Sequence, residues 1–348
     1  MKTALSNAYD MTDLGPISQF LGLQIVRDRV QYRLDLHQAP YIEEILTRFQ
    51  MSDCKGVWTP MESGIHLPPC QNDADLHARP EYQSKIGSVM YAMLGTRPDL
   101  AYTISSLSKH SDKPTRSHHI ALQRVFRYLK ETLNTQIRCE RPSGLPTLFP
   151  KPICYTDSDW AGHKDDRKST GGYVFLLCGG AISWRTRKQD IVATSSTEAE
   201  YVALTEAAKE AVWLRTLLME LESRVGTDTL PDITTNYFFG SLHQAQSESV
   251  LSQESRPHAE SGPGFTSSEP QQIYADNQGA IKLSENAQFH SKTKHIDLRY
   301  HYIRPAREQG EVSVTYIPTA EMTADLLTKP LAKVKHWKHM WAMGMITT

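Results

Sequence analysis

Two carboxylates stand at the end of a short apolar stretch near the middle of the chain. Residues Ile153, Cys154 and Tyr155 form the stretch, and Asp157 and Asp159 follow it with one residue between them. Acids at the end of an apolar, core-forming strand either cap the next turn or bind a positively charged group. The choice depends on whether acids elsewhere in the chain can reach the same place.

A further acid, Glu200, lies in the first turn of a predicted helix over about 197–222. It stands at the head of an apolar stripe, so we expect its side chain to point toward the sheet. The stripe contains Leu204, Ala207, Ala211, Leu214 and Leu218. A buried carboxylate is costly unless it is paired or binds a cation. The segment from Thr197 to Glu200 also has the spacing of a capping box, so the residues leave both roles open.

Two more acids occur where they could join the first pair. Asp276 ends the predicted strand 272–276, and Asp325 lies early in a predicted final helix that starts near 320. Asp276 could instead cap the next helix, and Asp325 could be a solvated helix acid. Two strand ends and two helix starts can converge on one edge of a sheet. Four oxygen donors without cysteine suit Mg²⁺ or Mn²⁺, and two such ions about 4 Å apart can clamp a phosphodiester during in-line displacement.

Composition places the chain among soluble globular proteins. The 348 residues carry a net charge of −1, and the length suggests about two domains. Five scattered cysteines without a CxxC pair argue against a zinc site or a disulfide framework. The chain shows no signal-peptide core and no apolar run of ~18 residues, which predicts an intracellular protein, in the cytoplasm or nucleus, without a membrane partner.

Three basic stretches suggest contacts with a phosphate backbone. They cover 185–189, 292–307 and 329–339, and aromatic residues interleave the last two. Lysine and arginine beside aromatic rings are typical of nucleic-acid surfaces, although each stretch alone could be a solvated helix face.

A proline-rich segment, 141–152, divides the predicted elements into two groups. The first group is mainly helical and consists of strands at 19–26 and 32–38, a helix within 39–51 and three helices within 82–138. The second group consists of a strand from 153, a hairpin of 172–178 and 181–186 around Gly179-Gly180, the helix at 197–222, a strand at 272–276, helices at 277–287 and 294–307, a strand at 312–318 and the final helix. This order predicts an α/β domain with a mixed sheet and flanking helices.

The second group carries five long motifs in a fixed order. They are CYTDSDWAG, DRKSTGGYVFLLCGGAISWRTRKQDIVATSSTEAEYVAL, YADNQGAIKL, KTKHIDLRYHYIR and TADLLTKPL. Together they resemble the ribonuclease H domain of copia-type retrotransposon Pol polyproteins. In the first group, MTDLGPISQFLGLQI is similar to the last palm hairpin of the reverse transcriptase, YIEEILTRFQMSDCKGVWTP to its thumb, and 82–130 to its connection region. The resemblance implies a reverse transcriptase remnant over 1–140, a linker over 141–152 and a ribonuclease H-like domain over 153–345.

The resemblance also implies a reaction and a set of site residues. The reaction is hydrolysis of the RNA strand of an RNA–DNA hybrid with two Mg²⁺ ions, for which Mn²⁺ can substitute, and it leaves a 5′-phosphate and a 3′-hydroxyl. The implied catalytic metal ligands are Asp157, Glu200, Asp276 and Asp325, with Asp159 as a neighbour. The implied nucleic-acid contacts are Arg185, Lys188, Asn277, Gln278, Lys292, Lys294, His295, Arg299 and His301. Such a hybrid can be recognised by its shape and its 2′-hydroxyls.

The chain departs from the family pattern in three places. It contains no YxDD turn, so polymerase activity is not expected, although the hairpin at 20–22 could grip a primer–template duplex. The stretch YIPTAEMTAD lacks the histidine that cellular ribonucleases H often carry before the last acid. Residues 223–270, rich in Ser, Glu, Gln, Pro and Gly, are predicted to form a disordered insertion. These departures keep open an alternative, an inactive nucleic-acid-binding relic of a truncated retrotransposon.

Overall fold

The computed structural model describes most of the chain and divides it into two compact units. The described residues are 6, 8–70, 78–141, 151–162, 165–224, 269–285 and 301–347. One unit combines Met1–Ile17 with Trp213–Glu269, and the other combines Ser18–Val212 with Pro270–Thr348. The second unit contains both sheets and all four acids predicted to be catalytic. The predicted insertion at 223–270 lies almost wholly outside the described residues.

An antiparallel sheet in the order β1-β2-β3-β4-β10 joins the start of this unit to its end. Its strands are β1 (Gln19–Phe20), β2 (Leu23–Asp28), β3 (Arg33–His37), β4 (Thr135–Glu140) and β10 (Met345–Thr347). The predicted strand 19–26 is split, because Leu21 and Gly22 form a two-residue turn with φ values of 45° and 74°. Positive φ at both positions is typical of a type I′ hairpin turn. The prediction of helix up to residue 138 was wrong, because the chain forms β4 from Thr135 onward.

The helices of the first group surround a hydrophobic core. They are α2 (Ala39–Arg48), α3 (Arg79–Gly95), α4 (Ala101–Ser108) and α5 (Arg116–Glu131), as predicted. α2 buries Ile42, Ile45 and Leu46, which have the spacing of one helical face. The same core includes Val174 of the second sheet and Leu327. The predicted groups therefore share a core, and the division at 141–152 stays a prediction.

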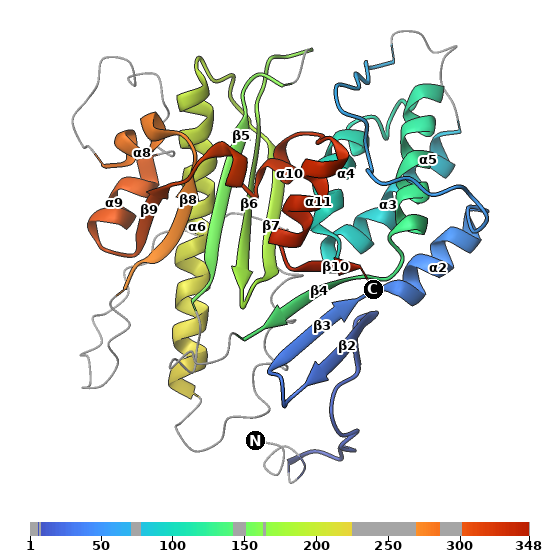
Figure 1. The fold of residues 1–348 in the computed structure, drawn as a ribbon, viewed down its shortest axis with the longest axis horizontal. Coiled ribbons are helices and arrows are strands. Elements are labelled where there is room, and N and C mark those ends of the chain that lie inside the picture. Colours follow the sequence, from blue (N-terminus) through green and yellow to red (C-terminus); the bar gives the residue numbers. More distant parts are fainter. Residues whose placement is uncertain are drawn as a thin grey trace. The chain divides into compact units, whose positions relative to one another are not determined.

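A mixed sheet in the order β7-β6-β5-β8-β9 confirms the predicted α/β architecture. Its strands are β5 (Ile153–Asp159), β6 (Thr170–Leu177), β7 (Gly180–Lys188), β8 (Gln271–Ala275) and β9 (Val312–Tyr316). β5, β6 and β7 are antiparallel neighbours, whereas β8 runs parallel to β5 and to β9. The helices between these strands are α6 (Ser196–Arg224), α8 (Gln278–Glu285) and α9 (Ile303–Glu308). Figure 1 shows α8 and α9 beside β9.

Two local predictions in the second group were wrong. The β6–β7 turn uses Cys178 and Gly179, with φ values of 49° and 80°, rather than Gly179 and Gly180. Gly180 belongs to β7, where an added Cβ would lie 2.6 Å from the backbone oxygen of Arg138 on β4. The predicted final helix is broken into α10 (Asp325–Thr328) and α11 (Lys333–Ala342). Pro330 accounts for the break, because proline has no backbone N–H to donate and its ring clashes with the carbonyl group four residues earlier in a helix.

Two adjacent glycines allow helices to approach both faces of β6. Successive residues of a strand point to opposite faces of the sheet. An added Cβ at Gly171 would lie 3.3 Å from the Cβ of Ala203 on α6, and one at Gly172 would lie 2.8 Å from the Cβ of Leu327 on α10. Gly172 is paired with Asp157 on β5. The close approach of α10 therefore occurs beside the strand position that carries Asp157.

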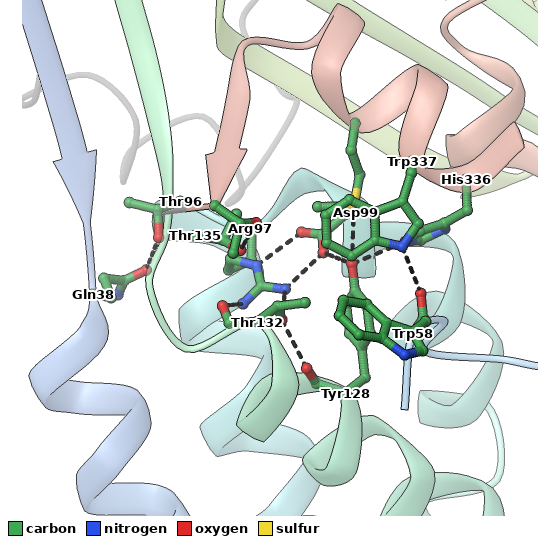
Figure 2. Close-up of polar contacts among 12 residues, drawn as sticks. Gln38, Trp58, Thr96, Arg97, Asp99, Tyr128, Thr132, Thr135, His336 and Trp337 are labelled. Atoms are coloured by element: carbon green, nitrogen blue, oxygen red, sulfur yellow. Dashed lines mark hydrogen bonds and ion pairs between the residues drawn. The ribbon is translucent and has the colours of Figure 1, made fainter. Parts of the chain in front are cut away.

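A buried polar network ties α11 to α5. Figure 2 shows the guanidinium of Arg97 donating to both oxygens of Asp99, with Nε 3.0 Å from Oδ1 and Nη2 2.8 Å from Oδ2. Both side chains have 0% exposure. The hydroxyl of Tyr128 on α5 donates to Oδ2 of Asp99 at 2.7 Å and lies 2.9 Å from Nε2 of His336 on α11.

Among the helices of the described residues, none has the length and apolar character needed to cross a membrane.

Candidate metal centre

Three carboxylates from three elements meet at one end of the mixed sheet. They belong to Asp157 on β5, Glu200 on α6 and Asp276 directly after β8, and one oxygen of each lies within 4.8 Å of the others. Parallel pairing brings two of them together. Tyr155 is paired with Tyr274, so Asp157 and Asp276, each two residues further along, lie side by side where the parallel pairing of β5 and β8 ends. The structure thus assembles three of the four acids predicted as ligands.

The carboxylate of Glu200 is buried and is not used to cap its own helix. The start of α6 is capped by other residues than the predicted Thr197 and Glu200. Oγ of Ser195 accepts the backbone N–H of Glu198 at 3.2 Å. The Glu198 carboxylate in turn accepts the backbone N–H of Thr194 at 2.7 Å. Glu200 is only 7% exposed, and within the described part of the chain nothing hydrogen-bonds to its Oε2. This oxygen is therefore available for a ligand.

The carboxylate of Asp276 is likewise not a helix cap. Oδ1 of Asn277 accepts the backbone N–H of Ala280 at 3.0 Å and so caps α8. Asn277, predicted to contact nucleic acid, has this structural role in the described fold. Asp276 remains directed toward the other acids, with a hydrogen bond from the side chain of Thr319.

The fourth predicted ligand, Asp325, lies beside the three carboxylates but is paired with a lysine. Nζ of Lys329 lies 2.8 Å from Oδ1 of Asp325 and 3.6 Å from Oδ2 of Asp157. The hydroxyl of Thr328 donates a hydrogen bond to Oδ2 of Asp157. Sequence reasoning missed Thr328 and the contacts of Lys329 with these acids, because it placed Lys329 in the basic stretch 329–339 that was expected to contact a phosphate backbone. Their spacing of three and four residues from a helix acid, which places side chains on one face, was the signal available.

Burial dominates the electrostatics of this centre. It raises the pKa of Asp157, Glu200, Asp276 and Asp325 above their usual values. The charges of Asp157 and Asp276 raise the pKa of Glu200 further, whereas Lys329 lowers the pKa of Asp157 and Asp325. For Lys329 itself, burial lowers the pKa, but the surrounding carboxylates outweigh burial and keep the ammonium charged. The centre therefore places four acids beside one lysine, and burial opposes ionisation of the acids unless a further cation binds.

The donor set fits a hard divalent cation. All three converging groups are carboxylates, and such ions prefer anionic oxygen ligands. The buried Oε2 of Glu200, which accepts no hydrogen bond from the part of the chain that the structure describes, would gain a partner from a bound ion. Asp159, on the same strand as Asp157, stays outside the group of three that the described residues form. Burial raises its pKa to about 6.

The residues predicted to contact nucleic acid are distributed differently. Arg185 lies 3.4 Å from Oε2 of Glu206, and Lys188 is paired with Asp166, so both cations have acidic partners. Nδ1 of His301 lies 2.9 Å from the hydroxyl of Tyr201 on α6. Gln278 is exposed at the start of α8. The remaining predicted contacts lie outside the described residues, and they are Lys292, Lys294, His295 and Arg299.

Comparisons with known proteins place the whole chain in one family. Residues 1–63 match the family described as "Reverse transcriptase (RNA-dependent DNA polymerase)". The Retrovirus-related Pol polyprotein from transposon TNT 1-94 of Nicotiana tabacum is 37% identical over 96% of this chain. The Retrovirus-related Pol polyprotein from transposon RE2 of Arabidopsis thaliana is 34% identical over 99% of it. The chain belongs to the copia-type retrovirus-related Pol polyproteins.

The chain matches only a small share of the length of these relatives. It spans 22% of the tobacco relative and 20% of the Arabidopsis relative, about a fifth of each. A crystal structure of RNase H1 from Halobacterium salinarum aligns with 51% of this chain and 94% of that chain, at 17% identity and a TM-score of 0.28. The strand order and the side-chain contacts of this chain itself define the arrangement of its acids.

Replacing Glu200 by glutamine should stabilise the metal-free Pol segment, and more so at higher pH. Because the folded state raises the pKa of Glu200, mainly by burial, it binds this proton more tightly than the unfolded state. The resulting stability is present at low pH and lost as pH rises through the folded pKa. The melting temperature of Glu200→Gln should exceed that of wild type by a margin that widens from about pH 5 to about pH 8.

The shift should be about 2–4 °C for each kcal/mol, measured by scanning calorimetry in chelator. Adding Mg²⁺ should raise the melting temperature of the wild type and leave Glu200→Gln nearly unchanged, because the variant lacks a ligand. Glu198→Gln is the matched control, since it weakens a helix cap and should lower the melting temperature at every pH. A pH-independent difference for Glu200→Gln would contradict the prediction.

Proposed function

We propose that this Pol segment is a divalent-metal-dependent ribonuclease that cuts the RNA strand of an RNA–DNA hybrid. The observation that carries the proposal is the meeting of Asp157, Glu200 and Asp276, with a buried Glu200 oxygen that has no partner within the described residues. Glu200 and Asp276 are not needed as helix caps, because Ser195 and Asn277 cap the helices that begin beside them. Membership of the Pol polyproteins supports a substrate made of nucleic acid.

Asp157, Glu200 and Asp276 would hold Mg²⁺, or Mn²⁺ in its place. When bound, the cation would supply positive charge that offsets the negative charge developing on the phosphodiester during displacement. Thr328 holds the Asp157 carboxylate in position, and Asn277 caps α8 so that Asp276 stays directed at the centre. In the proposed hydrolysis, a water oxygen bonds to phosphorus and the bond from phosphorus to the 3′ oxygen breaks. The products are a 5′-phosphate and a 3′-hydroxyl.

Recognition of the hybrid would rest on its shape. An RNA–DNA duplex presents a wide minor groove with 2′-hydroxyls, which a protein can recognise without reading the bases. Gln278 is exposed two residues after Asp276, and in this proposal it would meet the nucleic-acid backbone next to the acids. Arg185 and Lys188 would have to leave their acidic partners to bind phosphate.

The direct test is cleavage of an end-labelled RNA–DNA hybrid by the purified chain, with Mg²⁺, with Mn²⁺ and with chelator. Single-stranded RNA, double-stranded RNA and double-stranded DNA serve as substrate controls. We expect cuts in the RNA strand of the hybrid that require metal. A hybrid that is bound but stays intact at every metal concentration would reject the nuclease and favour a binding relic. Cuts that persist in chelator would reject the metal centre.

A further inference from the structure

Lys329 is the cation that the described structure places inside the acidic centre. Its Nζ lies 2.8 Å from Oδ1 of Asp325 and 3.6 Å from Oδ2 of Asp157. The carboxylates it touches are buried, with side chains 8% and 3% exposed, while the lysine side chain is 34% exposed. An ordinary surface pair such as Arg48 and Glu44 exposes both partners, at 50% and 59%. The Lys329 contacts are therefore those of a group that enters the centre from its rim.

The local sequence fixes this lysine in place. Lys329 follows α10 with φ −150° and ψ 155°, an extended conformation. Pro330 favours that conformation, because the proline ring disfavours helical angles at the preceding residue. Thr328, one residue earlier, donates its hydroxyl to Asp157. The three residues Thr328, Lys329 and Pro330 thus deliver a hydroxyl and an ammonium to the same carboxylate from one short turn.

Asp157 belongs to two different groupings of oxygen atoms. With Glu200 and Asp276 it forms the set of three carboxylates whose oxygens lie within 4.8 Å of one another. With Asp325 it forms a second pair, and in this pair the Lys329 ammonium lies against both carboxylates. Within the described residues, Oε2 of Glu200 in the first grouping and Oδ1 of Asp325 in the second both accept no hydrogen bond, but only the Asp325 oxygen has an ammonium 2.8 Å away.

We propose that the Lys329 ammonium occupies a second cation position between Asp157 and Asp325, so that the centre binds one divalent ion strongly and a second only by displacing this lysine. The inference rests on the proposed function, because it takes the three carboxylates to be a metal site. A divalent ion near Asp325 would meet both the steric bulk and the like charge of the ammonium. Lys329 acts here as a positioning residue that sets how many ions the centre holds.

Mn²⁺ binding to the full chain tests the inference without using activity. Isothermal titration and the Mn²⁺ electron paramagnetic resonance signal would give the number of ions and their affinities. Wild type should bind one ion strongly and a second weakly. Lys329→Met, which keeps a long unbranched side chain and removes the charge, should tighten the second site by about tenfold or more, because it removes a like charge from beside the ion. Lys329→Arg should keep the weak second site of the wild type.

Lys338→Met is the matched control, because Lys338 is an exposed lysine whose Nζ donates to the backbone oxygen of Ala320 at 2.6 Å. It should bind Mn²⁺ as the wild type does. If Lys329→Met does not fold, Lys329→Gln replaces it, since an amide can still donate to Asp325. Unchanged second-site affinity in the folded, uncharged variant would overturn the inference alone. Absence of any Asp157-dependent Mn²⁺ site in the wild type would instead reject the proposed metal centre.

Discussion

Asp157→Asn should abolish metal-dependent cleavage of the RNA strand while the protein stays folded. Asp157 lies two residues before the end of β5, contributes to the three-carboxylate group and also faces Lys329. The amide keeps the shape of the side chain and removes the anionic charge that a divalent cation needs. Changing an outer partner of a metal ligand costs roughly 10–100-fold in affinity or activity, so loss of the ligand itself should exceed that range. Hybrid cleavage rates and Mn²⁺ titration measure the two effects.

Asp159→Asn is the matched control for this prediction. Asp159 is on the same strand, is partly buried, and lies outside the three-carboxylate group of the described residues. The same change at this position should therefore leave most of the cleavage rate. Because removal of a buried like charge relieves repulsion, Asp157→Asn should also be at least as stable as wild type in chelator. Equal losses in the two variants would show that Asp157 has no special role.

The acids of the centre were predictable because their signals are local. An apolar strand that stops at an acid predicts a strand end, and an acid at the head of an apolar stripe predicts a helix start facing the sheet. These signals placed Asp157, Glu200 and Asp276 at elements that do converge. The capping role of Glu200 could not be settled from sequence, since Glu198 lies only two residues earlier and the choice depends on where the helix begins.

The elements that sequence reasoning missed depend on partners far away in the chain. β4 is short and pairs with β3 on one side and with β10 on the other, so its strand character comes from tertiary pairing. The contacts of Lys329 with the acids were missed for the same reason. Four residues after Asp325 this lysine fits an ordinary helical ion pair, and only the packing of α10 against β5 and β6 brings it to Asp157. The reaction itself was suggested by the family motifs rather than by the spacing of the acids.

The buried network of Arg97 and Asp99 was also invisible in the sequence, where both residues look like the polar start of a helix. In the structure their side chains are fully buried, and Figure 2 shows them between Thr132 and Tyr128 of the first group. The single proton of the Tyr128 hydroxyl goes to the Asp99 carboxylate, the strongest acceptor nearby. Nε2 of His336 therefore donates to Tyr128. Burial lowers the pKa of His336 to about 4, which keeps the imidazole neutral in this role.

Asp99→Ala should destabilise the protein by about 3–5 kcal/mol, because it leaves the buried Arg97 guanidinium without its counter-charge. Equilibrium unfolding in urea, followed by circular dichroism, measures the loss. Tyr128→Phe removes hydrogen bonds but no charge and should cost only about 1–3 kcal/mol. Glu44→Ala removes one partner of an ion pair that exposes 50% and 59% of its side chains and should cost about 0.5 kcal/mol or less. His336 ties α11 to this network, so Asp99→Ala should also loosen α11 and the following strand β10. Hydrogen exchange would detect this loosening as faster amide exchange at Met345–Thr347. Equal destabilisation by Asp99→Ala and Glu44→Ala would show that the buried pair does not hold the end of the chain in place.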